Sequence, residues 1–346
     1  MNGYRLVPLA EVPKPAQEVF FTQAFGPHKA AFLLEHGHWW HGGSRARFAV
    51  LDEQGQIVAY NALIASRIRR PQAVDEVLWL VDIYVLPQQR GKGLQHLLDE
   101  GLRALGRAQV GFPNAIAAPI HRKHGWGVRD DGWYMHWPIS RRAQDSLRYR
   151  LGWQGKLLRG LARLDDPWQR RQRFASLQSV AAPQVRRLPT LDGALLASVF
   201  AQDQSSLTTL RDEAYFDWRY GQCPYPQQFR AYLAEDGDQQ VALISRLLTI
   251  KGLRTLRIED TFGSARPDLL RQALALALRD GLAQRAEHAL AVTTDDAART
   301  VYEDLGFRRG APLAFCWYHQ DAAWMAAIEA LRPHWTFADS DLSYSA

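Results

Sequence analysis

The chain repeats one order of sequence features at an almost constant spacing. Gly55, in the turn of a hairpin pattern, is matched by Gly237, which follows it by 182 positions. Gly125 and its aromatic neighbour are matched by Gly306 and another aromatic residue, 181 positions later. A constant spacing of this kind is typical of a duplicated unit, and 346 residues suffice for about two domains. The sequence therefore predicts two copies of one domain.

Hydrophobic periodicity predicts a mixed order of helices and strands in both copies, and hence an α/β (α+β) fold class. In the first copy we expect a helical segment at 16–36, strands at 46–52, 56–68 and 77–86, a helix at 94–107, a strand at 108–112, a helix at 115–123 and a strand at 132–139. In the second copy, 184–319, we expect a helix at 267–285, a strand at 289–293 and a helix at 295–304.

These elements divide the chain into four parts. Residues 1–140 form the first domain and residues 183–320 the second. Between them, 141–182 is expected to be a basic helical linker, because apolar and basic residues alternate there at helical spacing. The remaining segment, 321–346, is expected to hold a helix at 321–331 and a tail.

Composition favours a soluble cytoplasmic protein. The sequence contains no run of about 18 apolar residues, and its first residues lack the basic and apolar pattern of a secretion signal. Two cysteines, Cys223 and Cys316, are too few for a disulfide framework, and neither has a cysteine nearby that would complete a zinc site. We therefore expect a reducing compartment and no bound metal.

The net charge of +6 is concentrated in one segment. Residues 141–173 hold ten basic and three acidic side chains, so the rest of the chain is close to neutral. Such a segment is either a solvated linker or a contact for an anionic substrate or a membrane surface. No nucleic-acid partner is expected, because the segment lacks a nucleic-acid-binding motif and its aromatic residues do not interleave regularly with the charges.

The most informative local pattern is a strand, a glycine-containing loop and a helix in direct succession. The strand ends at Pro87, the loop has glycine at Gly91 and Gly93, and an amphipathic helix begins at Leu94. Glycine permits positive φ and lets a ligand approach the backbone, and the N-terminus of a helix attracts anions. Together with the charge of Arg90 and Lys92, this pattern indicates a pyrophosphate site; a simple glycine-relaxed turn is the alternative.

This pattern resembles the acetyl-CoA loop of the GNAT N-acyltransferases, whose core is Gln/Arg-x-x-Gly-x-Gly/Ala after a strand. The resemblance implies two tandem GNAT-like domains, each with a mixed, mostly antiparallel sheet, flanking helices and a splayed central strand pair. It implies acetyl-CoA as co-substrate, with the pantetheine arm along the strand end and the pyrophosphate on the loop. The implied binding residues are Ile83, Tyr84, Val85, Gln88, Gln89, Arg90, Gly91, Lys92, Gly93, Leu94 and Asn114. Asn114 is equally well explained as a helix N-cap.

Each copy departs from the full family pattern. The second copy has a segment, Thr294 to Phe307, that resembles the family's Asn-x-x-Ala-x-x-x-Tyr-x-x-x-Gly-Phe, with Tyr302 at the tyrosine position. It lacks the Gly-x-Gly loop and has Asp268 near the helix start, where a carboxylate repels an anion. The first copy has the loop, but His121 replaces the tyrosine. We therefore assign CoA to the first copy and a structural or substrate-shaping role to the second.

Two side chains are candidates for acid–base chemistry. Asp82 lies within an apolar strand, where an unpaired carboxylate is costly, so it is either a base or amine anchor or the partner of an arginine on a facing helix. His121 is either an acid towards the CoA thiolate or an ordinary surface histidine. Glu259 and Asp260 occupy the position of Asp82 in the second copy.

The acceptor is expected to be a small-molecule amine. Short segments, such as Gly111 to Asn114 and Ala338 to Asp341, resemble bacterial tandem GNAT-type proteins of surface-polysaccharide biosynthesis. That resemblance implies an amino sugar, carried on a nucleotide or a lipid diphosphate. Two alternatives stay open: an aminoacyl-tRNA-dependent ligase of the FemAB type, and a non-catalytic CoA-binding or scaffold module.

Overall fold

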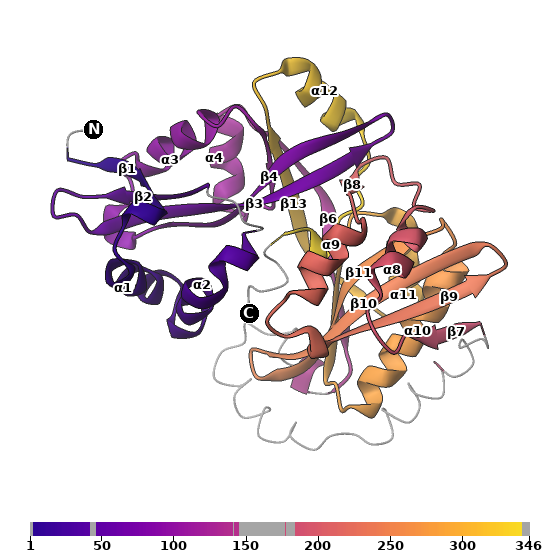
Figure 1. Ribbon diagram of the computed structural model, residues 1–346. Helices are drawn as coiled ribbons and strands as arrows, with labels where there is room; N and C mark the ends of the chain where they lie inside the picture. Colours follow the sequence, from indigo (N-terminus) through magenta and orange to yellow (C-terminus); the bar gives the residue numbers. More distant parts are fainter. Residues whose placement is uncertain (1–2, 42–45, 141, 145–176, 178–183, 341–346) are drawn as a thin grey trace.

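The computed structural model describes residues 3–41, 46–140, 142–144, 177 and 184–340. These residues form a mixed sheet of 13 strands, which is flanked by helices (Figure 1). The expected α/β class with a mixed sheet is thus confirmed. The expected linker at 141–182 lies outside the described residues apart from 142–144 and 177, and so does the tail at 341–346. Within the described part of the chain, no helix is long and apolar enough to cross a bilayer.

The described residues of the first half, 3–41 and 46–140, form six strands and four α-helices. The strands are β1 (Arg5–Pro8), β2 (Arg47–Leu51), β3 (Ile57–Arg70), β4 (Ala73–Val85), β5 (Ala108–Gly111) and β6 (Gly127–Pro138). The helices are α1 (Lys14–Phe25), α2 (Pro27–Trp40), α3 (Leu94–Arg103) and α4 (Ala117–Lys123). The single helical segment expected at 16–36 is two helices, because Gly26 has a φ of +83° and is followed by a proline. The other expected elements are present with shifted ends.

The second half repeats the order of three strands, helix, strand, helix and strand. Its strands are β7 (Val185–Arg187), β8 (Thr208–Thr209), β9 (Phe229–Asp236), β10 (Gln239–Ile250), β11 (Leu253–Gly263), β12 (His288–Thr293) and β13 (Arg308–Tyr318). Its helices are α8 (Gly193–Phe200), α9 (Glu213–Phe216), α10 (Pro267–Ala283), α11 (Asp296–Asp304) and α12 (Ala322–Ala330). The helices expected at 267–285, 295–304 and 321–331 correspond to α10, α11 and α12.

The two halves exchange their last strands. The sheet order is β1-β2-β3-β4-β5-β13-β6-β12-β11-β10-β9-β7, and β8 pairs with β3. In the first half, β5 pairs with β13, which belongs to the second half, through Gly111 opposite Cys316. In the second half, β12 pairs with β6, which belongs to the first half, through Ala289 opposite Trp137. One continuous sheet results, while the division at 140 and 183 stays a prediction.

Helices cover the sheet of the first half on both faces (Figure 1). On one face, Leu94 and Leu98 of α3 pack against Val50 and Val58. On the other face, α1 and α2 contribute aromatic and aliphatic side chains to the largest buried cluster, which contains Tyr60 of β3. Each fully buried side chain of this kind contributes about 1.5–3 kcal/mol to stability. The packing fixes β4 between the two layers.

The neighbouring parallel strands β4 and β5 diverge. Their pairing runs from Val77 opposite Ala108 to Leu80 opposite Gly111. β4 then continues for five residues to Val85, whereas the chain after Gly111 leaves the sheet towards α4. Beyond Leu80, the edge of β4 that faces β5 therefore has no strand partner. Along this edge no neighbouring strand pairs with the backbone of β4, and the carbonyl of Val85 accepts a hydrogen bond from the Arg90 side chain.

Candidate active site

A pocket of about 580 Å³ opens where β4 and β5 diverge. Its walls come from the ends of both strands, the loop before α3, the first turn of α3, the junction of α1 and α2, and α4. Of the residues predicted for the site, it gathers Asp82, Ile83, Tyr84, Val85, Gln89, Arg90, Gly91, Leu94, Asn114 and His121. Gln88, Lys92 and Gly93 lie in the same loop but do not line the pocket.

The loop before α3 presents free backbone N–H groups to the pocket. Gly91 and Gly93 have φ values of +80° and +76°, which residues with a side chain rarely adopt. A Cβ atom at Gly91 would meet nothing within 4 Å, so the backbone is open at this point. Among the residues described, no acceptor receives the N–H groups of Gly91 to Gln95. These five donors and the start of α3 fit a pyrophosphate group.

Two cationic side chains border the loop. Arg90 is exposed, and its Nε donates to the carbonyl of Val85 at 3.3 Å. Lys92 is also exposed, and its Nζ donates to Oε1 of Gln89 at 2.8 Å. Their positive charge adds to the partial charge of the helix N-terminus. Leu94, in contrast, has its side chain in the core, so its contribution to a ligand is its backbone N–H.

Asp82 lies at a bulge of β4. Asp82 and Ile83 together face the single residue Asn61, since Tyr60 pairs with Tyr84 and Ala62 pairs with Val81. Asp82 is the residue of the bulge with a positive φ, +54°. A non-glycine residue in this conformation is uncommon and costs about 1–3 kcal/mol, which the surrounding packing must offset. The bulge turns the Asp82 side chain into the wall of the pocket.

The Asp82 carboxylate is fully buried between two cationic or ionisable groups. Lys29 Nζ of α2 lies 2.5 Å from Asp82 Oδ1, and His41 Nε2 lies 3.6 Å from Asp82 Oδ2. Burial alone would raise the pKa of Asp82, but the Lys29 ammonium and His41 outweigh it and lower the pKa to about 2. A carboxylate with this pKa is a weak proton acceptor near neutrality. The arrangement is the ion pair with a helix that was the structural alternative, with Lys29 in place of the expected arginine, and a role of Asp82 as base or substrate-amine anchor stays a prediction.

His121 is buried in the wall of the pocket, so the surface alternative does not hold. Its side chain is 3% exposed, and its ring centroid lies 4.7 Å from that of Trp126. Its Nδ1 has no hydrogen-bond partner among the described residues. Burial lowers the pKa of His121, and Asp99 only partly counteracts this effect. The imidazole is therefore neutral at physiological pH.

Asn114 lines the pocket and also caps α4. Its Oδ1 accepts hydrogen bonds from the N–H groups of Ile116 and Ala117, at 3.0 and 2.9 Å. These bonds are typical of a helix N-cap. The geometry thus supports the capping interpretation, while contact with a bound pantetheine stays a prediction.

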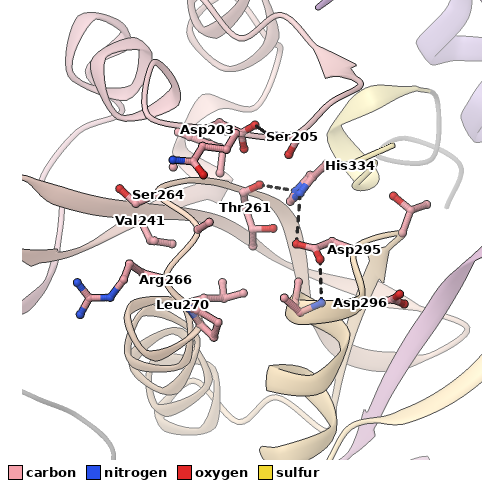
Figure 2. Close-up of a pocket in the computed structure, with 18 of the residues that line it drawn as sticks. Asp203, Ser205, Val241, Thr261, Ser264, Arg266, Leu270, Asp295, Asp296 and His334 are labelled. Carbon is pink, nitrogen blue, oxygen red and sulfur yellow. Dashed lines mark hydrogen bonds and ion pairs between the residues drawn. The ribbon is translucent and has the colours of Figure 1, made fainter. Parts of the chain in front are cut away.

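The second half has a corresponding pocket of about 670 Å³ where β11 and β12 diverge (Figure 2). Here His334 points at the free edge of β11, and its Nε2 lies 2.8 Å from the carbonyl oxygen of Thr261. Asp295 borders the same space, with its Oδ2 3.9 Å from His334 Nδ1. A backbone edge that is already covered by a side chain offers less to a pantetheine arm.

The polar residues singled out in the second half form buried contacts. Asp260 pairs with Arg211 at 2.8 Å, and Glu259 pairs with Arg257 at 2.8 Å. Tyr302 is 1% exposed, and burial raises its pKa well above the usual value. None of these three acidic or phenolic groups lines the pocket. Whether the second copy has a structural or a substrate-shaping role stays a prediction.

Comparison with known proteins identifies the fold. No protein-family model and no curated protein sequence matches the chain. Among solved structures, N-myristoyltransferase of Saccharomyces cerevisiae with bound myristoyl-CoA is similar, with a TM-score of 0.56 and 14% identity over 92% of this chain and 83% of the other. A GCN5-related N-acetyltransferase from Kribbella flavida has a TM-score of 0.58 and 16% identity, over 95% and 73% of the two chains.

A third similar structure is a probable N-acyltransferase from Enterococcus faecalis, with a TM-score of 0.55 and 12% identity over 90% of this chain and 71% of the other. At such low identities the likeness concerns the fold. The GNAT-like fold expected from the loop motif is therefore confirmed: this chain has the architecture of GNAT-like N-acyltransferases.

Proposed function

We propose that the protein is an acyl-CoA-dependent N-acyltransferase and that its co-substrate is acetyl-CoA. The pyrophosphate would bind the N-terminus of α3, and the pantetheine arm would lie along Ile83 to Val85. The observation that carries this proposal is the set of free N–H groups from Gly91 to Gln95, at the mouth of a pocket between diverging strands. The GNAT-like fold of the chain is consistent with it.

The reaction is a transfer of an acyl group from sulfur to nitrogen. The neutral amine of the acceptor attacks the thioester carbonyl carbon, the C–S bond breaks, an amide forms, and the amine proton ends on the CoA thiol. Positioning and polar stabilisation of the carbonyl oxygen supply most of the rate in such reactions. His121 lines the pocket and is neutral, so it is the candidate that accepts the proton of the attacking amine and then, as imidazolium, donates it to the CoA thiolate. Asp82 holds Lys29 in place.

The proposed acceptor is a small-molecule amine, and an amino sugar on a nucleotide or lipid diphosphate is the specific candidate. The basic segment 141–173 supports an anionic carrier of this kind, because ten basic side chains there would attract phosphates. We propose that the reaction takes place in the cytoplasm, where acetyl-CoA is present.

Calorimetric titration of acetyl-CoA tests the site. Gly91→Glu places a side chain and a negative charge beside the free N–H groups, and the loss of two charge-assisted hydrogen bonds should weaken binding by about 100-fold or more. Gly237→Glu is the matched control, since Gly237 also has a positive φ, +57°, and open space, but lies in the turn between β9 and β10.

Wild type and Gly237→Glu should bind acetyl-CoA with similar affinity. If Gly91→Glu bound acetyl-CoA as tightly as wild type, or if wild type did not bind it, the proposed site would be contradicted. Release of free thiol with a panel of amino sugars then separates an enzyme from a CoA-binding scaffold.

A further inference from the structure

Asp99 of α3 is a buried carboxylate between α3 and α4. Its side chain is 2% exposed, whereas the other buried residues of this helix are leucines. One carboxylate oxygen accepts a hydrogen bond from Nε2 of Gln95 at 3.1 Å, and the other is paired with Nδ1 of His124 on α4. Burial of an ionised carboxylate is costly unless such partners are present. Both oxygens are therefore held in fixed positions.

Asp99 lies behind the wall of the pocket between β4 and β5. Its partner Gln95 lines this pocket, and so do His121 and Cys316. His124 follows His121 by three positions on α4, so the two side chains are neighbours on one face of the helix. Burial raises the pKa of the Cys316 thiol and lowers that of His121, and the charge of Asp99 acts on both groups. The carboxylate thus lies within electrostatic reach of the pocket wall.

The proposed reaction requires His121 to carry a positive charge for part of the cycle. Its imidazole takes the proton of the attacking amine and returns it to the CoA thiolate when the C–S bond breaks, so it ends neutral. Burial disfavours the charged intermediate form. Nδ1 of His121 has no hydrogen-bond partner among the described residues, so no direct acceptor there stabilises an imidazolium. A nearby negative charge would do so.

The other charged groups around His121 do not supply this negative charge. In another wall of the pocket, Asp82 is already paired with the Lys29 ammonium at 2.5 Å. His124 is 20% exposed, and its positive charge when protonated lowers the pKa of His121. The charge of Asp99 has the opposite effect and raises it. Asp99 is therefore the carboxylate that favours an imidazolium at His121.

We propose that Asp99 acts on acyl transfer through His121: its buried negative charge stabilises the imidazolium that forms there, while Gln95 and His124 hold the carboxylate in position. Asp99 is thus a positioning residue and touches no substrate. The inference rests on the proposed function and deepens it, because it names the group that allows a buried histidine to take up a proton.

Nuclear magnetic resonance of ¹⁵N-labelled histidine rings in the full chain tests the proposal without CoA or an acceptor. The pKa of His121 is read from the pH dependence of its ring nitrogen signals, which the variant His121→Gln assigns. Asp99→Asn keeps the shape of the side chain but removes its charge, and should lower the pKa of His121 by about one unit. Asp130→Asn is the matched control, because its exposed pair with Arg122 is screened by water, and should leave the pKa unchanged.

A second variant tests the opposite sign. His124→Gln removes the opposing positive charge but keeps a donor towards Asp99, so the pKa of His121 should rise. Addition of Asp99→Asn to this variant removes both charges and should lower the pKa again, which keeps the effect measurable even if wild-type His121 titrates only in strong acid. A pKa of His121 that responds to neither change would overturn the inference.

Calorimetric titration of wild type with acetyl-CoA separates this failure from a failure of the proposed function. Binding of acetyl-CoA without a response of His121 to Asp99→Asn would refute the inference alone. A response of His121 without acetyl-CoA binding would refute the proposed function.

Discussion

Trp39 and Trp218 exchange hydrogen bonds between the two halves of the chain. The indole N–H of Trp39 donates to the carbonyl of Trp218 at 2.7 Å, and the indole N–H of Trp218 donates to the carbonyl of Trp39 at 2.8 Å. Both rings line a pocket of about 420 Å³ with Tyr215 and Arg67. The pair therefore connects the end of α2, the helix that also carries Lys29, to the second half.

Trp218→Phe removes one of these two donors while keeping an aromatic ring. We expect the free energy of unfolding to fall by about 1–3 kcal/mol, because the carbonyl of Trp39 loses that partner in a partly buried place. Urea-induced unfolding measures this change. Trp126→Phe is the control, since the Trp126 indole N–H has no partner among the described residues and its loss breaks no hydrogen bond. Equal losses in both variants would contradict this account.

Arg211 neutralises two buried carboxylates. Its guanidinium contacts Asp260 at 2.8 Å and Asp339 at 2.9 Å, and all three side chains are fully buried. Arg211→Met should lower the free energy of unfolding by about 3–5 kcal/mol, because it leaves uncompensated charge in the core. Arg67→Met, which breaks an exposed pair with Asp212, should cost at most about 1 kcal/mol in the same unfolding measurement. A small loss of unfolding free energy in Arg211→Met would contradict this account of the two buried carboxylates.

The ion pair of Asp82 predicts a pH dependence of stability. The pKa of Asp82 is lowered to about 2 in the folded chain, whereas an unfolded aspartate has a pKa of about 3.9. Its contribution is therefore present above about pH 4 and is lost as the pH falls through 2. Between these values the free energy of unfolding of wild type should fall by about 2 kcal/mol more than that of Asp82→Asn. Parallel curves for the two proteins would disprove the coupling.

Gly127 allows close contact between the two exchanged strands. A Cβ atom there would lie 2.2 Å from Cε2 of Trp317, which pairs with Gly127 across β6 and β13. Gly127→Ala should therefore lower the free energy of unfolding by about 1–3 kcal/mol. Gly193→Ala, at the start of α8 with only ordinary contacts, should be neutral or slightly stabilising in the same assay.

Local features of the site were predictable from consecutive residues. The strand end, the two glycines and the amphipathic helix at Leu94 lie within a dozen positions, and each has its own composition signal. The same holds for α10 and α11, whose expected ends differ from the observed ones by at most two residues. The break at Gly26 also had a signal, since Gly-Pro commonly interrupts a helix.

Contacts between distant residues were not predictable in this way. Lys29 and His41 meet Asp82 across 53 and 41 positions, and no periodicity relates them. Asp82 has a positive φ although it is not glycine. Because few non-glycine residues adopt this conformation, the residue type alone did not predict the bulge. The exchange of β6 and β13 could not be predicted, because the hydrophobic pattern of a buried strand is the same whichever half of the chain it pairs with.

The exchange of last strands sets the order in which the molecule is completed during synthesis. When the ribosome has made residue 140, β5 still lacks its neighbour, because β13 spans residues Arg308–Tyr318. The edge of β5 therefore lacks its neighbouring strand until residues Arg308–Tyr318 have been made. A fragment that holds either half alone would have a sheet without one of its strands.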